Sequence, residues 1–152
     1  MRLMVVAAFS LVCAAPAAAQ DFTATPNYGI VRLAPGFSPD PHLVVVQAGG
    51  GIDVSSTLKN CSGFITSAPD LRLFWDGSGS LDLKVSVISN ADATIVINGP
   101  SGSWFCDDDS GDGSNPSVPL SSVSGQYDIW VGIFSGDGTR PAVVSISELS
   151  SF

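Results

Sequence analysis

The sequence contains only 1 histidine, His42, and this scarcity counts against two common classes of hydrolase. A serine triad needs a base held between a nucleophile and an acid, and the chain carries no GxSxG elbow or other nucleophile signature. A zinc site needs several His or Cys ligands, which this chain does not supply. Because Pro41 precedes His42 and marks a turn, we expect this histidine at the surface, where a strand begins. The sequence therefore predicts a protein without catalytic residues.

Basic residues and glutamate are also scarce. The chain has 6 Lys and Arg against 14 Asp and Glu, for a net charge of −8, so nucleic acid is an unfavourable partner. Glu148 is the one glutamate, and every other acid is Asp, which favours turns and cation binding over helices. No stretch keeps the apolar spacing of three and four that a helix needs over a dozen residues. These absences predict an all-β chain rich in turns.

Long apolar runs are missing as well, and the longest lies at the start of the chain. Residues 1–19 combine a basic start at Arg2, an apolar run and a small-residue end, which is typical of a cleaved signal peptide. The run is too short for a membrane span, and Pro16 interrupts it. We expect cleavage after Ala19 and a mature chain, from Gln20 onward, that is secreted or periplasmic and has no membrane span.

What the sequence does contain is alternation of apolar and polar residues between turns rich in Gly, Asn, Asp, Ser and Pro. This pattern predicts one domain, residues 20–152, built as a β-sandwich of jelly-roll type with seven to eight short antiparallel strands. The expected strands are 29–33, 42–48, 63–66, 71–75, 81–87, 94–98, 126–134 and 141–149. We expect 81–87 to form a hairpin with 94–98, and 126–134 to be a central strand covered on both faces.

Two cysteines remain after the signal peptide, Cys61 and Cys106. In an exported protein an even pair favours a disulfide, which would join the middle of the chain to the segment around Cys106. The alternative is two buried thiols.

The strongest concentration of charge follows Cys106, in WFCDDDSGDGSNP (residues 104–116). Carboxylates so close together repel one another and need either full solvation or a cation. Calcium prefers such oxygen ligands, and the glycines let the backbone fold tightly. The spacing matches neither the helix-flanked calcium loop nor the calcium β-roll repeat. The alternatives are a calcium site and a solvated turn, and the candidate ligands are Asp107, Asp108, Asp109, Asp112 and Asp128, with Asp70 or Asp76 as further candidates.

Tryptophans raise a separate possibility. Trp75, Trp104 and Trp130 either fill a core or, if exposed, stack on the rings of a sugar ligand.

The order of the motifs CSGFI, APDLRLFW, GPSGSWFCDDDSG and GQYDIWVG resembles the bacterial pre-peptidase C-terminal domain, over about residues 39–149. It is also similar to small secreted alphaproteobacterial proteins built from that unit alone. The resemblance implies a jelly-roll β-sandwich, commonly stabilised by calcium, that serves as a non-catalytic appendage of secreted peptidases. Carried over to this chain, it implies cation contacts from Asp107, Asp108 and Asp109, and from Asp128.

Taken together, these features predict a secreted, non-catalytic, calcium-binding accessory module with a protein or polysaccharide partner outside the cytoplasm. One alternative is a carbohydrate-binding module that uses exposed tryptophans. Another is a peptidase-associated protein without catalytic residues of its own.

Overall fold

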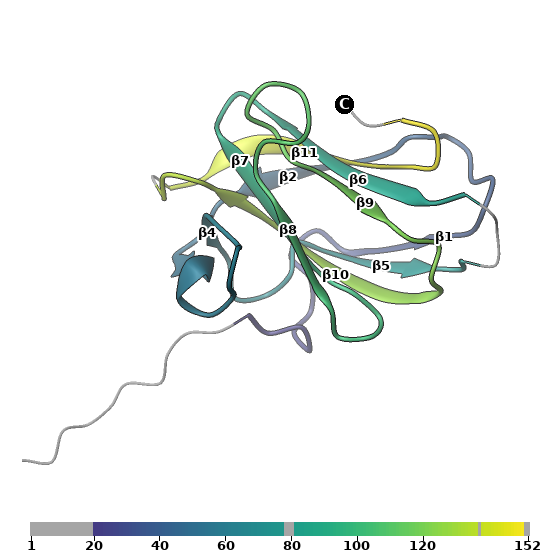
Figure 1. Ribbon diagram of the computed structural model, residues 1–152, viewed down its shortest axis with the longest axis horizontal. Helices are drawn as coiled ribbons and strands as arrows, with labels where there is room; N and C mark the ends of the chain where they lie inside the picture. Colours follow the sequence, from purple (N-terminus) through teal and green to yellow (C-terminus); the bar gives the residue numbers. More distant parts are fainter. Residues whose placement is uncertain (1–19, 78–80, 137, 151–152) are drawn as a thin grey trace, which may run out of the picture.

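Two β-sheets packed face to face form the body of the protein, as the computed structural model shows for residues 20–77, 81–136 and 138–150 (Figure 1). The predicted all-β sandwich is confirmed. The expected signal peptide, residues 1–19, lies outside the described residues. Within the described part of the chain, no helix has the length and apolar character needed to cross a membrane.

The larger sheet has seven strands, and β10 (Gly125–Ile133) runs through its middle. One edge of β10 pairs first with β5 (Leu71–Trp75) and then with β4 (Phe64–Ile65), while the other edge pairs with β7 (Ala93–Asn98). The sheet is completed by β1 (Ile30–Leu33) beside β5, β3 (Ile52–Asp53) beside β4, and β8 (Trp104–Asp107) beside β7. A short 3-10 turn, η1 (Val54–Ser56), follows β3.

The smaller sheet has four strands in the order β2, β11, β6, β9. Their bounds are β2 (His42–Ala48), β11 (Arg140–Ser147), β6 (Leu83–Ser89) and β9 (Ser117–Leu120). His42, the only histidine of the sequence, begins β2 as expected and pairs with Ile146.

The main core lies between the sheets and is built by period-two alternation. Val85 and Val87 of β6 and Val144 of β11 point inward from the small sheet, and Ile129 and Val131 of β10 meet them from the large sheet. All five are fully buried, so this interleaved apolar layer supplies the hydrophobic stabilisation of the sandwich.

A second apolar cluster covers part of the outer face of the large sheet. Val96 and Trp130 point outward there and pack under the loop that carries Val54 and Cys61. The disulfide between Cys61 and Cys106, with a Cα–Cα distance of 5.3 Å, ties this loop to β8. β10 is therefore covered on both faces, as predicted for residues 126–134, because its alternate side chains enter different cores.

Three expectations about strands differ from the structure. The segments 81–87 and 94–98 form no hairpin: β6 lies in the small sheet and β7 in the large one, so the turn between them crosses from sheet to sheet. Leu81, the first residue of the expected strand 81–87, precedes β6 and is exposed. The described residues contain eleven strands rather than seven to eight, and the pair β1–β5 is parallel.

Candidate functional site

One row of paired residues crosses the outer face of the large sheet. Trp104 on β8 pairs with Asn98 on β7, Asn98 pairs with Asp128 on β10, and Asp128 pairs with Arg72 on β5. Directly paired residues of an antiparallel sheet point to the same face, so these side chains form a continuous line across four strands. The row begins beside the second apolar cluster, where the rings of Trp104 and Trp130 lie 5.6 Å apart.

A pocket of about 550 Å³ opens above this row. Such a volume lies within the range of about 300–1,000 Å³ that is usual for small-ligand sites. We call it the strap pocket, because residues 20–28, here called the strap, pass over it and contribute Phe22. Its lining consists of Phe22, Asn98, Gly99, Pro100, Gly102, Trp104, Gly125, Gln126 and Asp128.

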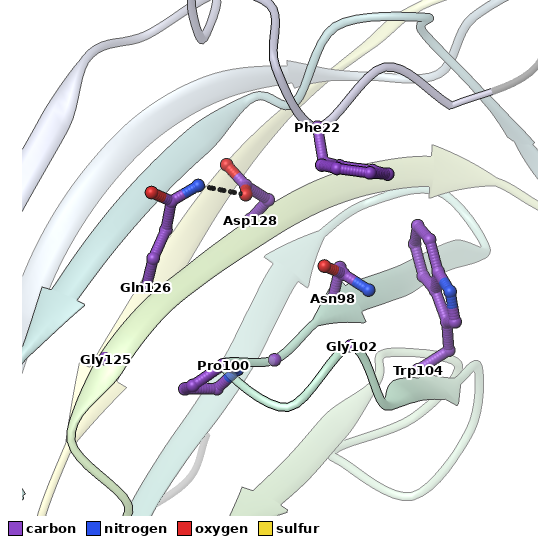
Figure 2. Close-up of a pocket in the computed structure, with 9 residues that line it drawn as sticks. Phe22, Asn98, Pro100, Gly102, Trp104, Gly125, Gln126 and Asp128 are labelled. Carbon is purple, nitrogen blue, oxygen red and sulfur yellow. Dashed lines mark hydrogen bonds between the residues drawn. The ribbon is translucent and has the colours of Figure 1, made fainter.

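Figure 2 shows how the side chains of the strap pocket are disposed. The rings of Phe22 and Trp104 lie toward one side of the hollow, Gln126 and Asp128 lie toward the other, and the Asn98 amide lies between these two groups. Phe22 is 50% exposed, although a side chain of this kind gains most by burial. The pocket therefore combines two aromatic walls with a polar floor.

Arg72 holds the strap over the pocket. Its Nη2 donates hydrogen bonds to the carbonyl oxygens of Phe22 (2.6 Å) and Ala24 (3.2 Å), and its Nε donates to Asp128 Oδ1 at 2.7 Å. The Asp21 backbone N–H adds a bond to the Ser67 carbonyl oxygen. The guanidinium thus joins the strap to the floor, and its charge is matched by a carboxylate that is almost completely buried.

Asp128 is held on both sides. Besides the bond from Arg72, its Oδ2 accepts a hydrogen bond of 2.7 Å from Gln126 Nε2. Asp128 was expected as a calcium ligand, but it lies three residues along the ladder from the rung of Asp107, about 10 Å at the rise of a strand. The structure therefore places Asp128 in the strap pocket and away from the acidic loop.

The three tryptophans have different environments. Trp75 and Trp130 are 2% and 0% exposed and belong to the main core and the second cluster, so neither offers a face to a ligand. Trp104 is partly exposed and lines the strap pocket. Of the stacking candidates named from the sequence, only Trp104 is in a position to stack on a ligand.

Asp70 fills a gap in the large sheet close to the strap. Its Oδ2 accepts a hydrogen bond from the Val131 N–H at 2.7 Å, and its Oδ1 accepts one from Asn27 Nδ2 at 3.1 Å. Along β10, pairing with β5 ends at Ile129 and pairing with β4 occurs at Ile133. The Asp70 carboxylate accepts from the Val131 N–H in the gap between these two partners. Burial raises the pKa of Asp70 to about 6, and the bonds from Val131 and Asn27 oppose that rise. Asp70 therefore satisfies a backbone N–H group inside the large sheet.

In the acidic loop, Asp107 closes the turn between β8 and β9. Its Oδ2 accepts hydrogen bonds from the N–H groups of Ser117 (2.7 Å) and Ser110 (3.1 Å), and its Oδ1 accepts one from Ser110 Oγ (2.6 Å). Serine donors satisfy this carboxylate, so the loop has a defined shape without a cation.

The other acids of the loop are held less firmly. Asp108 accepts a hydrogen bond from Ser62 Oγ, whereas Asp109 and Asp112 are exposed. Partial desolvation, followed by the charges of Asp108, Asp92 and Asp107, raises the pKa of Asp109. Among the described residues, no three acidic, histidine or cysteine side chains are grouped so that they could hold a metal ion.

Three residues that line the pocket were not predicted from the sequence: Phe22, Asn98 and Gln126. Phe22 lies in a segment without periodicity, and only the path of the strap brings it to β8 and β10. Asn98 and Gln126 look like ordinary polar residues near strand ends. A usable signal was Asp128, a lone charge within the apolar strand 126–134, because a charge in such a strand needs a partner.

Comparisons with known proteins give a fold likeness only. No family model matches the chain, and no curated protein matches it. The chain is similar to the pre-peptidase C-terminal domain of collagenase from Bacillus anthracis, with 11% identity, a TM-score of 0.47, and coverage of 78% of this chain and 94% of that chain. It is also similar to PliG from Aeromonas hydrophila, a periplasmic inhibitor of g-type lysozyme, with 12% identity, a TM-score of 0.36, and coverage of 78% and 96%. Neither likeness assigns a ligand.

Proposed function

We propose that the protein is a non-catalytic binding module that works outside the cytoplasm and takes its ligand in the strap pocket. The observation that carries this proposal is the pocket itself: an exposed aromatic ring, Phe22, lines it beside polar side chains, and the Arg72–Asp128 ion pair holds the segment that carries this ring. A ring in this position adds little to the core, because half of its surface stays in water. The exposed face of the Phe22 ring is therefore available to contact a ligand in the strap pocket.

The lining chemistry supports binding over catalysis. Asp128 is the one ionisable group among the lining residues, and both of its oxygens are already bonded, to Arg72 and Gln126. Hydrolysis by acid and base requires two such groups or a nucleophile with its base. The disulfide between Cys61 and Cys106 supports a location in an oxidising compartment.

Calcium binding by the acidic loop is a second proposal. The crowding of carboxylates in this loop supports it: besides desolvation, which is the larger cause, the charges of Asp108, Asp92 and Asp107 raise the pKa of Asp109. Because serines already occupy the Asp107 carboxylate, calcium would have to rearrange the loop. This role would be one of stabilisation, separate from the strap pocket.

Nuclear magnetic resonance tests the binding proposal. A 15N-labelled sample is titrated with a mixed library of small sugars, amino acids and short peptides. We expect some members to move the amide signals of Gly102, Trp104 and Gln126, while those of the acidic loop stay in place. A library that moves no pocket signal, or moves signals only elsewhere, contradicts the proposal.

A further inference from the structure

The aromatic walls of the strap pocket restrict the shape of its ligand. The Phe22 ring is half exposed, Trp104 is partly exposed, and the two rings line one hollow (Figure 2). Flat apolar surfaces stack on aromatic faces, and this contact removes water from both. The ligand therefore presents at least one flat, partly apolar face.

The polar side chains of the pocket floor favour ligand groups that both donate and accept hydrogen bonds. The Asn98 side chain makes no hydrogen bond to the described residues, so its carbonyl and amino groups are both available to a ligand. The Gln126 side chain is oriented by the bond from its Nε2 to Asp128. Its carbonyl oxygen makes no hydrogen bond to the described residues and is therefore also available to a ligand. Hydroxyl groups match such a floor, because each hydroxyl donates one hydrogen bond and accepts others.

Charge excludes anionic ligands from this site. Asp128 lies in the floor, and the cation beside it, Arg72, is already committed to Asp128 and to the strap carbonyls. The whole chain carries a net charge of −8, which repels polyanions. A sulfated, phosphorylated or uronic-acid ligand would find no free cation among the residues that line the pocket.

We infer that the strap pocket binds a neutral glycan, with the apolar face of a pyranose ring stacked on Phe22, the more exposed of the two rings, and its hydroxyls bonded to Asn98 and Gln126. The inference rests on the proposed binding function and names its ligand class. A pyranose is uncharged, has an apolar face of C–H groups, and carries hydroxyls around its rim. The apolar face matches the aromatic walls, the hydroxyls match the polar floor, and the absence of charge suits a pocket without a free cation.

The site is preorganised for this ligand. Arg72 fixes the strap by two carbonyl contacts and fixes Asp128 by a third bond. Gly125, which also lines the pocket, packs its backbone directly against Pro100. Its φ is +145°, and a side-chain Cβ at this position would lie only 2.5 Å from the Cβ of Pro100. A rigid site loses little conformational entropy on binding, which favours a useful affinity from few contacts.

Titration with neutral oligosaccharides tests the inference. The probes are cellohexaose, xylohexaose and chitohexaose, each added to 15N-labelled protein, with binding followed at the pocket amides. We expect at least one probe to bind there. Phe22→Ala should weaken that binding about tenfold by loss of stacking. Asn98→Ala should also weaken it, and should do so without loss of stability, because the Asn98 side chain supports no other residue.

Phe134→Ala is the matched control. Phe134 is 48% exposed, much like Phe22, but follows the opposite end of β10. Its replacement should leave glycan binding unchanged. If no oligosaccharide moves the pocket signals, the glycan inference is wrong. In that case peptides that do move them would leave the binding proposal standing, and a pocket that responds to neither class would overturn both.

Discussion

Asp70 is a buried carboxyl whose hydrogen bonds, from Val131 and Asn27, involve no cation. It is fully buried, its partners are two neutral N–H donors, and its pKa is raised from 3.8 to about 6. A carboxyl with a raised pKa in the folded state stabilises the fold most below its unfolded pKa, and this stability is lost as the pH rises through the folded pKa. A shift from 3.8 to about 6 corresponds to about 3 kcal/mol of stability, lost between about pH 4 and pH 6.

Asp70→Asn tests this linkage. The amide keeps an oxygen for the Val131 N–H and removes the charge, and the Asn27 amide can turn to accept from the new nitrogen. We expect the variant to gain about 3 kcal/mol relative to the wild type between pH 4 and pH 7. Urea unfolding at a series of pH values measures the difference. Parallel stability curves for the two proteins would contradict the assigned pKa.

At the scale of elements, the strap and the acidic loop have different kinds of support. The strap is anchored by Arg72, a partly buried cation, and by backbone bonds to the loop before β5. The acidic loop is closed by serines around Asp107, while Asp109 extends into solvent among like charges. The support of the strap positions the Phe22 side chain, whereas the bonds of the acidic loop leave the charge of Asp109 without a cationic partner among the residues described.

Calcium should therefore raise the melting temperature if it binds the acidic loop. A ligand bound only by the folded state adds about 2.7 kcal/mol at a hundredfold excess over Kd, which is several degrees for a domain of this size. Asp109 is the diagnostic residue, because replacing Asp107 would also remove the bonds from Ser110 and Ser117. We expect Asp109→Asn to reduce the calcium effect and, by relieving repulsion, to stabilise the calcium-free protein slightly.

Magnesium at equal concentration is the control for this experiment, because it carries the same charge but demands a smaller octahedral site. We expect it to have much less effect than calcium. Scanning calorimetry with and without chelator gives the comparison. If the wild-type melting curve is the same in both, the loop is a hydrogen-bonded turn and the calcium proposal fails.

At the scale of the whole molecule, one covalent bond restricts the unfolded chain. The disulfide spans 45 residues, from the loop over the second cluster to β8. It contributes chiefly by limiting the conformations of the unfolded state, and an effect of about 4 kcal/mol is expected for a loop of this length. The pocket side chain Trp104 also lies near this bond, two residues before Cys106.

Removal of the disulfide should lower stability without changing the fold class. We expect Cys61→Ala/Cys106→Ala to lose roughly 2–4 kcal/mol in urea unfolding, and reduced wild type to behave similarly. Reductant should leave the double variant unaffected, which makes it the control. A thiol assay in denaturant without reductant should detect no free thiol, and two equivalents would show that the bond does not form.

The fold class and most strands could be predicted from the sequence, because period-two alternation is a local property that follows from which face of a strand is buried. The cysteine pair could be predicted as well, since only two cysteines follow the expected signal peptide. The double burial of β10 could be predicted for the same reason: both of its faces are apolar.

The pairing of strands and the contacts between distant side chains, by contrast, depend on how the whole chain packs. The segment after β6 crosses to the other sheet, and no local pattern distinguishes such a crossing from a hairpin. The strap pocket joins Phe22, Asn98 and Asp128 from three distant parts of the chain through strand register and one partly buried arginine, Arg72. Register and long-range contacts depend on the free energy of the whole packed molecule, so the sequence pattern at any one of these residues could not predict the site.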